Sequence, residues 1–142
     1  QTLLTLHSLN MLHTFGFLAE LFNILARHNV SVDLITTSEV SVALTLDTTG
    51  STSTSASLLT QALLTELSSL CRVEVEEDLA LVAIIGNELS KACGVGKEVF
   101  GVLDPFNLRM ICYGASSYNL CFLVPGNDAE SVVRTLHRNL FE

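Results

Sequence analysis

The hydrophobic positions of this chain follow a two-residue period in some segments and a helical period in others. Alternating apolar runs predict β-strands, and apolar spacings of three and four residues predict amphipathic helices. In the first half these patterns predict strands at 2–8, 30–37, 40–46 and 71–76, and helices over 16–28 and 58–70. The order β-α-β-β-α-β is that of the ferredoxin-like α+β arrangement, in which one face of an antiparallel sheet carries two helices.

The second half repeats this order and stops one element short. Strands are predicted at 79–85, 108–113 and 120–124, and helices over 95–103 and 129–140. The second unit therefore follows β-α-β-β-α and lacks its last strand. We expect two domains, residues 1–78 and 79–142.

A shift of 78 positions places the first unit on the second without a gap, and the matches fall on core and turn positions. The matched pairs include Gly16 with Gly94, Glu20 with Glu98, Leu25 with Leu103, Asn29 with Asn107 and Ser38 with Ser116. In this register Asp33 falls on Ile111, so a charge stands where the second unit has an apolar residue.

Composition narrows the class of protein. The chain has 142 residues, 49% of them hydrophobic, and a net charge of −8. This hydrophobic content excludes a disordered chain, and the acidic balance argues against a nucleic-acid partner. No apolar run approaches the ~20 residues of a membrane span, and no signal peptide is found, so we expect a cytoplasmic location. The surplus of apolar residues predicts an interface with another copy or with the rest of a longer parent chain, and a start at Gln1 agrees with a fragment.

Most of the polar motifs predict no chemistry. The four cysteines have no C-x-x-C spacing and no nearby histidine pair, which argues against zinc and favours small buried residues in a reducing environment. The segment Gly94–Lys97 departs from the phosphate-binding loop pattern. No arrangement of nucleophile and histidine can be argued from the order of residues.

The junction between the first strand and helix is the strongest candidate site. Gly16 permits a tight turn, and the unpaired N–H groups near Phe17 and Leu18 suit a carboxylate. If Asp33 of the next strand lies opposite, it suits an ammonium group, and together they describe a pocket for a free amino acid. Alternatively, Gly16 only makes a turn and Asp33 is only an exposed strand residue; the residues alone leave both interpretations open.

Several segments resemble the C-terminal regulatory region of the lysine-sensitive aspartokinases of enteric bacteria. They include 7–13, Gly16-Phe-Leu-Ala-Glu20, 31–47, 82–86, Cys93-Gly-Val-Gly-Lys-Glu-Val-Phe-Gly101, 110–116 and 139–142. The resemblance covers essentially the whole chain and implies two tandem ACT domains, which bind amino acids and regulate the enzyme that carries them. It implies a parent chain with an N-terminal kinase domain that phosphorylates L-aspartate with ATP and Mg²⁺. The fragment itself is then not an enzyme and needs no cofactor or metal.

The resemblance also implies an L-lysine pocket and a homodimer through the first ACT domain. The lysine-binding positions are Met11, Thr14, Gly16, Phe17, Leu18, Ser31, Val32, Asp33, Ser38 and Glu39, and changes at Thr37, Ser38 or Thr45 relax feedback inhibition in the family. Thr14-Phe15 departs from the family's serine and basic residue but keeps a hydroxyl. The second unit, with Ile111 at the matched position, is not expected to bind lysine, and its missing strand is expected from the segment preceding residue 1.

Two other functions remain open at this point. The chain could be a stand-alone amino-acid sensor that controls another protein in trans, or a structural dimerisation module that binds no ligand.

Overall fold

The structure is a computed structural model, which describes residues 1–9, 15–46, 60–87 and 93–141. The chain divides into two compact units, residues 1–77 and 78–142, each with its own hydrophobic core. No helix in the described part of the chain is long and apolar enough to cross a membrane.

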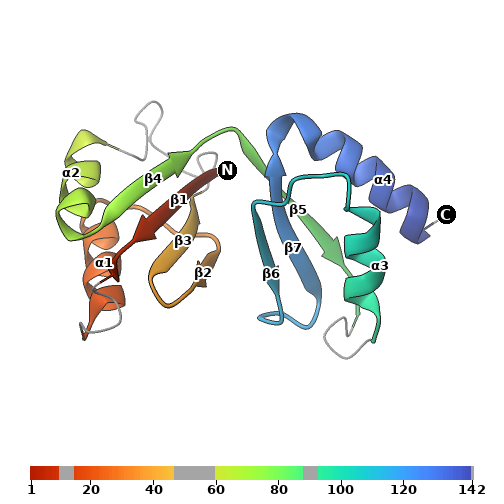
Figure 1. The fold of residues 1–142 in the computed structure, drawn as a ribbon, viewed down its shortest axis with the longest axis horizontal. Coiled ribbons are helices and arrows are strands. Elements are labelled where there is room, and N and C mark those ends of the chain that lie inside the picture. The colour runs from red at the N-terminus through yellow and green to blue at the C-terminus, as the bar shows by residue number, and fades with distance from the viewer. Residues whose placement is uncertain (10–14, 47–59, 88–92, 142) are drawn as a thin grey trace. The chain divides into compact units, whose positions relative to one another are not determined.

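The first unit is a four-stranded antiparallel sheet with two helices on one face (Figure 1). Its elements are β1 (Thr2–His7), α1 (Phe17–Arg27), β2 (Ile35–Thr37), β3 (Ser41–Leu46), α2 (Gln61–Leu70) and β4 (Arg72–Glu76). The strand order is β2-β3-β1-β4, so β2 and β4 form the two edges. This confirms the predicted ferredoxin-like α+β class.

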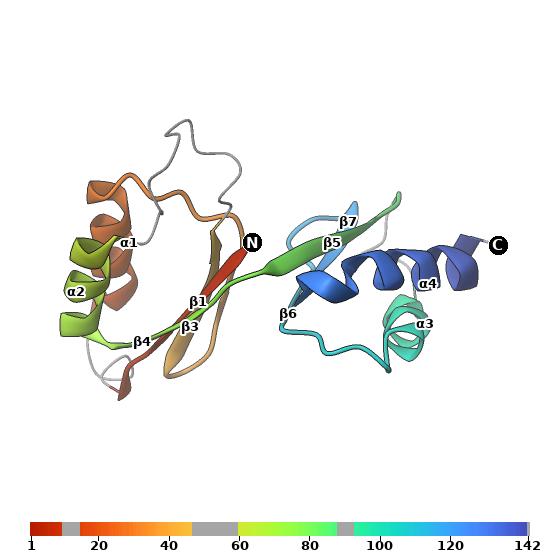
Figure 2. The same cartoon turned by 90° about the horizontal axis from the view of Figure 1, so that it is seen from above.

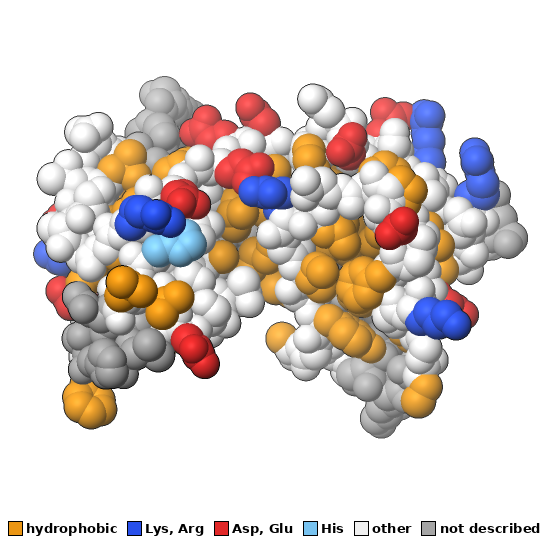
Figure 3. All heavy atoms as spheres, in the orientation of Figure 1, with side chains coloured by type: hydrophobic (Ala, Val, Ile, Leu, Met, Phe, Trp, Pro, Cys, Tyr) orange, Lys and Arg blue, Asp and Glu red, His pale blue; other side chains and the backbone are white. Residues whose placement is uncertain are grey.

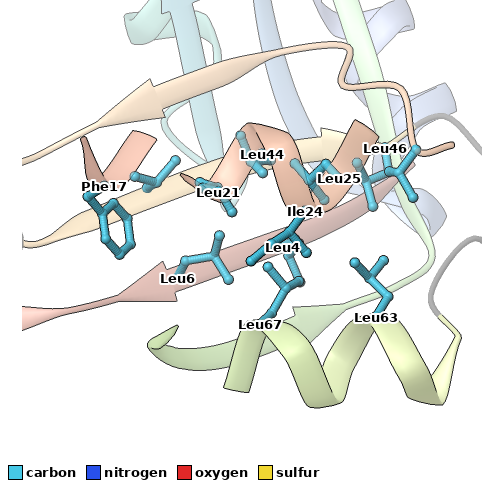
Figure 4. Close-up of a cluster of buried hydrophobic side chains, with 12 residues drawn as sticks. Leu4, Leu6, Phe17, Leu21, Ile24, Leu25, Leu44, Leu46, Leu63 and Leu67 are labelled. Atoms are coloured by element: carbon cyan, nitrogen blue, oxygen red, sulfur yellow. The ribbon is translucent and has the colours of Figure 1, made fainter. Parts of the chain in front are cut away.

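The core of the first unit lies between the helices and the sheet and is built from leucines (Figure 4). Phe17 at the start of α1 lies beside Leu6 near the end of β1, and Leu25 near the end of α1 lies beside Leu46 of β3. Because Leu46 pairs with Thr2 at the start of β1, the end of α1 lies over the start of β1, and α1 runs antiparallel to β1. The first residues of α1 therefore lie at the end of the sheet where β1 finishes.

The second unit is a three-stranded antiparallel sheet with the order β5-β7-β6. Its elements are β5 (Leu79–Ile85), α3 (Val95–Val102), β6 (Met110–Tyr113), β7 (Asn119–Pro125), the short 3₁₀ helix η3 (Gly126–Asp128) and α4 (Ala129–Phe141). Helices α3 and α4 contact each other (Figure 2). In the first unit β4 lies beside β1, but the described residues provide no strand in the corresponding place beside β5. One edge of β5 is therefore open.

Three details differ from the predictions. Only Ile35–Thr37 of the predicted strand 30–37 forms a strand, because the preceding residues make a bulge described below. The apolar spacing in helix 16–28 predicts one core-facing stripe of Phe17, Leu18, Leu21, Phe22 and Leu25. In the structure Leu18 and Phe22 are exposed, while Ile24 is buried. The predicted start of α2 at residue 58 lies outside the described residues, and the described helix begins after Thr60, whose hydroxyl accepts the N–H of Leu63 at 3.2 Å.

Candidate functional site

One end of the first unit, which we call the hairpin end, contains the start of α1 and the turn between β2 and β3. The Ser8 N–H donates to the carbonyl of Val40 at 2.8 Å, which brings the end of β1 to this turn. Gly16, Phe17, Leu18, Thr37, Ser38 and Glu39 of the predicted site lie here. Met11 and Thr14 lie outside the described residues.

The start of α1 has the geometry expected of an anion site. Gly16 has φ 80° and ψ 15°, a left-handed conformation that strains any residue with a Cβ. Its carbonyl accepts the N–H of Glu20 at 3.0 Å and so begins the helix. The N–H groups of the first turn have no intrahelical acceptors, and the helix dipole adds partial positive charge at the same place. Among the described residues, no atom lies within 4 Å of a Cβ built at Gly16.

The β2–β3 turn is held by Ser38. Its N–H donates to the carbonyl of Ser41 at 2.8 Å, and the two serine hydroxyls lie 2.6 Å apart. Glu39 is exposed in the same turn. The hairpin end therefore combines helical N–H groups, which suit a carboxylate, with a carboxylate at Glu39, which suits a cation.

The opposite end of the first unit, which we call the bulge end, holds Ser31, Val32 and Asp33. After α1 the chain turns at Asn29, whose φ of 57° is left-handed, and the Val30 N–H donates back to the carbonyl of Leu25 at 2.9 Å. Val32 packs partly buried against the core, whereas Ser31 and Asp33 are exposed. The chain thus presents the Asp33 carboxylate outward immediately after α1.

Thr45 holds this segment in place by three hydrogen bonds. Its carbonyl accepts the Asp33 N–H, its N–H donates to the Leu34 carbonyl, and its Oγ1 accepts the Leu34 N–H, each at 2.9 Å. Asp33 and Leu34 thus both lie opposite the single residue Thr45, which is the arrangement of a β-bulge. Thr45 is completely buried, so its hydroxyl cannot be replaced by water without a rearrangement. This gives Thr45 a physical role in positioning Asp33.

The two ends lie too far apart for one small ligand. Asp33 and Ser38 are five positions apart along the segment that contains β2, which corresponds to about 16 Å of extended chain. The prediction that the start of α1 faces Asp33 is therefore wrong within one copy of the chain. The structure brings Gly16, Phe17 and Leu18 to the hairpin end, and Ser31, Val32 and Asp33 to the bulge end.

The second unit has the same bulge with the opposite charge. Met110 pairs with Leu123, and the Arg109 N–H also donates to the Leu123 carbonyl at 2.8 Å, as Asp33 does toward Thr45. The structural counterpart of Asp33 is therefore Arg109, and the match to Ile111 suggested by the gapless repeat is wrong. Helix α3 starts as α1 does, after a left-handed glycine, Gly94, with φ 83°.

The predicted site included Leu18 but not the apolar surface of the first unit to which Leu18 belongs. Phe15, Leu18 and Phe22 follow a helical spacing on the outer side of α1, with exposed fractions of 103%, 41% and 37%. Ile35 of the edge strand β2 is also exposed. The helical spacing of Leu18 and Phe22 is visible in the sequence, but spacing alone does not show whether apolar side chains face the core or the solvent. The sequence pattern therefore placed both residues in the core.

Comparison with known proteins defines the class. Residues 82–140 match the ACT domain family, in agreement with the ferredoxin-like topology. The fold of the chain is that of ACT domains, modules here arranged in tandem.

The chain is 84% identical over its whole length to lysine-sensitive aspartokinase 3 of Escherichia coli, and corresponds to its C-terminal part. It spans 32% of the length of that protein. Crystal structures of E. coli aspartokinase III, also 84% identical, match it in the aspartate and ADP complex (R-state), with a TM-score of 0.92 over 99% of this chain and 32% of that one. The complex with lysine and aspartate (T-state) matches with a TM-score of 0.87 over 100% of this chain and 31% of that one.

Proposed function

We propose that the chain is the lysine-sensing regulatory part of an aspartate kinase, and that L-lysine binds between the first units of two copies. The observation that carries this proposal is the division of the site residues between two ends of the first unit. The lysine complex of the 84% identical E. coli protein supports the choice of ligand.

A two-fold dimer would reunite the two halves of the site. In an isologous pair, a surface that contacts the partner at one end is contacted in return at the other end. If two copies pair antiparallel along α1 and β2, the hairpin end of each copy meets the bulge end of the other. Two equivalent pockets result, each with helical N–H groups from one copy and Asp33 from the second.

The surfaces needed for this dimer are exposed. Strand β2 is an edge strand, and an unpaired edge can continue a sheet into a second copy. The outer side of α1 carries the stripe of Phe15, Leu18 and Phe22, which would pack against the same stripe of the second copy. Burial of such side chains stabilises by roughly 1.5–3 kcal/mol each.

The charges of the pocket suit lysine. The N–H groups at the start of α1 would bind the α-carboxylate of the ligand. Asp33 of the second copy and Glu39 are two carboxylates for the two ammonium groups of lysine, each a charge-assisted hydrogen bond. An amino acid with an uncharged side chain would leave one carboxylate without a partner.

The open edge of β5 suggests how the second unit is completed. A hollow of ≈ 610 Å³ lies between β5 and α4 and is lined mainly by Leu81, Val82, Ala83, Ala129 and Val133. We expect a strand from the segment preceding residue 1 of a longer chain to pair with β5 there, as β4 pairs with β1. The two domains would then be residues 1–78 and 79–142 together with that strand.

Regulation would follow from a two-state equilibrium. Lysine binding at the dimer interface favours the arrangement in which an attached kinase domain, which uses ATP and Mg²⁺ to phosphorylate L-aspartate, is inactive. Coupling between two such sites is typically ~1–3 kcal/mol. The coupling requires that lysine bind one arrangement more tightly than the other.

Titration calorimetry of the chain with L-lysine tests the ligand, with D-lysine and L-norleucine as matched controls for chirality and for the second ammonium group. We expect one lysine per chain and little heat from either control. An absence of heat together with an unchanged melting temperature at millimolar lysine would overturn the proposal.

A melting-temperature screen against the other amino acids separates the remaining functions. Stabilisation by a different amino acid would indicate a sensor of other specificity, and no stabilisation by any would indicate a structural dimerisation module. Inhibition of a kinase only in trans would indicate a stand-alone sensor.

A further inference from the structure

Two cysteines of the second unit lie directly opposite each other on neighbouring strands. Cys112 of β6 is the register partner of Cys121 of β7. All four cysteines of the chain lie in its described part, and they are thiols rather than disulfides. Residues directly opposite in an antiparallel pair point to the same face of the sheet, so the two sulfur atoms share one face.

The hydrogen-bond pattern defines the spacing of this pair. The Leu123 carbonyl accepts the Arg109 N–H, so the backbone of Leu123 faces β6. Every second residue of a strand faces the same way, and Cys121 therefore faces β6 as well. Cys112 and Cys121 occupy a hydrogen-bonded pair, in which the Cα atoms are about 5.5 Å apart.

This spacing suits a bridging ion better than a direct sulfur–sulfur bond. Directly opposite Cβ atoms lie roughly 4.5–5.5 Å apart, at the wide end for a hydrogen-bonded pair. A disulfide requires Cβ atoms roughly 3.5–4.5 Å apart, so the strands would have to move together. An ion that holds each sulfur at about 2.3 Å spans the wider gap without such movement.

The surroundings of the pair also favour a soft ion. Cys121 is 8% exposed and Cys112 is partly exposed, so an ion can approach through Cys112. Burial, and then the neighbouring Cys121, raise the pKa of the Cys112 thiol, so Cys112 meets the ion as a thiol and releases its proton on binding. On the other side of Cys121, its register partner on β5 is Ala83, which is exposed and has only a methyl side chain.

We propose that Cys112 and Cys121 form a two-sulfur binding site for a soft, thiophilic ion of the Cu(I) or trivalent arsenic type. Soft ions select thiolate ligands. In the described part of the chain no group of three or more histidine, cysteine, aspartate or glutamate side chains gathers, which suits an ion satisfied by two sulfurs. A bound ion would join β6 to β7 below their connecting turn.

The reaction with a trivalent aryl arsenical balances without an oxidant. Two As–S bonds form and the As=O bond breaks. The two thiol protons leave with the oxygen as one water molecule. Arsenic stays in the +3 state, and both cysteines keep their oxidation state.

Phenylarsine oxide is the first probe, added to the 142-residue chain and followed by intact mass and by competition with a small dithiol. We expect one arsenical per chain in the native protein and in the C71S/C93S variant, which serves as the matched control. C112S and C121S should each bind about 10²–10⁴-fold more weakly, because the second sulfur acts at a high effective concentration. Cys121→Ala provides a second variant of the buried position, with the fold of each variant verified by circular dichroism.

Titration with Cu(I), supplied from a competing chelator, shows whether the site takes a metal ion as well as the arsenical. Binding of one Cu(I) per chain that C112S abolishes assigns the site to a metal, whereas binding of the arsenical alone assigns it to a metalloid. Binding of neither, or equal binding by the C112S/C121S variant and the native chain, would overturn the proposal.

Discussion

The two units differ most clearly between the first helix and the edge strand. From Leu25 to Thr45 and from Leu103 to Leu123 the chain takes the same number of steps, 20 in each case. In the first unit Asp33 lies eight positions after Leu25, whereas in the second unit Arg109 lies six positions after Leu103. The second unit recovers the difference in its hairpin, which has six residues between Tyr113 and Leu120 against four between Thr37 and Val42.

This difference gives a physical reason for the proposal that lysine binds to the first unit and not to the second. The first unit has two additional residues between helix and bulge, where Ser31 and Val32 lie, and a carboxylate at the bulge. The second has a shorter connection and the guanidinium of Arg109 in the equivalent place. A gapless sequence repeat can therefore contain two compensating shifts, and the residues that differ in geometry are those proposed to bind the ligand.

The units also differ in how they expose apolar surface. The first exposes a stripe on α1, whereas the second has an open strand edge beside β5, and hydrophobic side chains gather over its strands (Figure 3). The first surface suits a second copy of the same unit. The second suits an additional strand.

The largest expected effect comes from the apolar stripe of the first unit. Phe22→Glu places a charge in the proposed dimer interface, so it should leave a monomer with no measurable lysine binding, since neither end alone forms the pocket. Sedimentation velocity and calorimetry measure the two effects. Asn23→Glu, an exposed change on the other side of α1, should remain dimeric and bind lysine. A monomeric Phe22→Glu chain with native affinity would refute the shared pocket.

The reversed charges of the two bulges provide the next test. Asp33→Asn should weaken lysine binding about 10–100-fold, because a hydrogen bond to a charged group contributes about 1.5–3 kcal/mol. Arg109→Gln, the matched change in the second unit, should leave the affinity unchanged. Calorimetry measures both, and equal losses in the two variants would mean that the comparison between the bulges has no bearing on lysine.

Thr45 allows the bulge itself to be loosened. Thr45→Val keeps the shape but leaves the Leu34 N–H without its acceptor, which should cost about 1–3 kcal/mol of unfolding free energy. Urea unfolding measures this loss, and lysine affinity should fall with it because Asp33 is no longer held. Thr45→Ser, which keeps the hydroxyl, should recover most of both. Native affinity in a destabilised Thr45→Val chain would separate Thr45 from the site.

Substitution of the glycines that precede α1 and α3, Gly16 and Gly94, should have the smallest effect, and its cost in stability should be similar in the two units. Gly16→Ala and Gly94→Ala each force alanine into a left-handed conformation, which should cost about 1–2 kcal/mol in either unit. Within the described part of the chain no atom lies within 4 Å of the new Cβ at either position, so the penalties should be similar in thermal unfolding. Only Gly16→Ala should reduce lysine affinity. A loss of affinity in Gly94→Ala would show that the second unit takes part in binding.

Much of the fold could be predicted because apolar periodicity is a local property. Strand 79–85 was predicted with the bounds found for β5, and helix 129–140 differs from α4 by one residue. The turn at Gly16 was also predicted, and its left-handed φ of 80° confirms it. The contrast between Asp33 and an apolar partner was wrong, because Arg109 takes the place given to Ile111. The arrangement of Gly16 and Asp33 could not be predicted, because it depends on residues far away in the sequence.

The sequence by itself determined the element types, the repeat, the β-α-β-β-α order of the second unit and the chemical character of the candidate residues, since each follows from neighbouring positions along the chain. Only the tertiary structure decided that Thr45 faces both Asp33 and Leu34, that Arg109 takes the place of Asp33, and that the helix start and Asp33 lie at opposite ends. These facts are set by strand register and by the direction of α1 across the sheet. Register depends on pairing between distant segments, and the hydrophobic pattern of one strand does not specify which residues of another strand it pairs with.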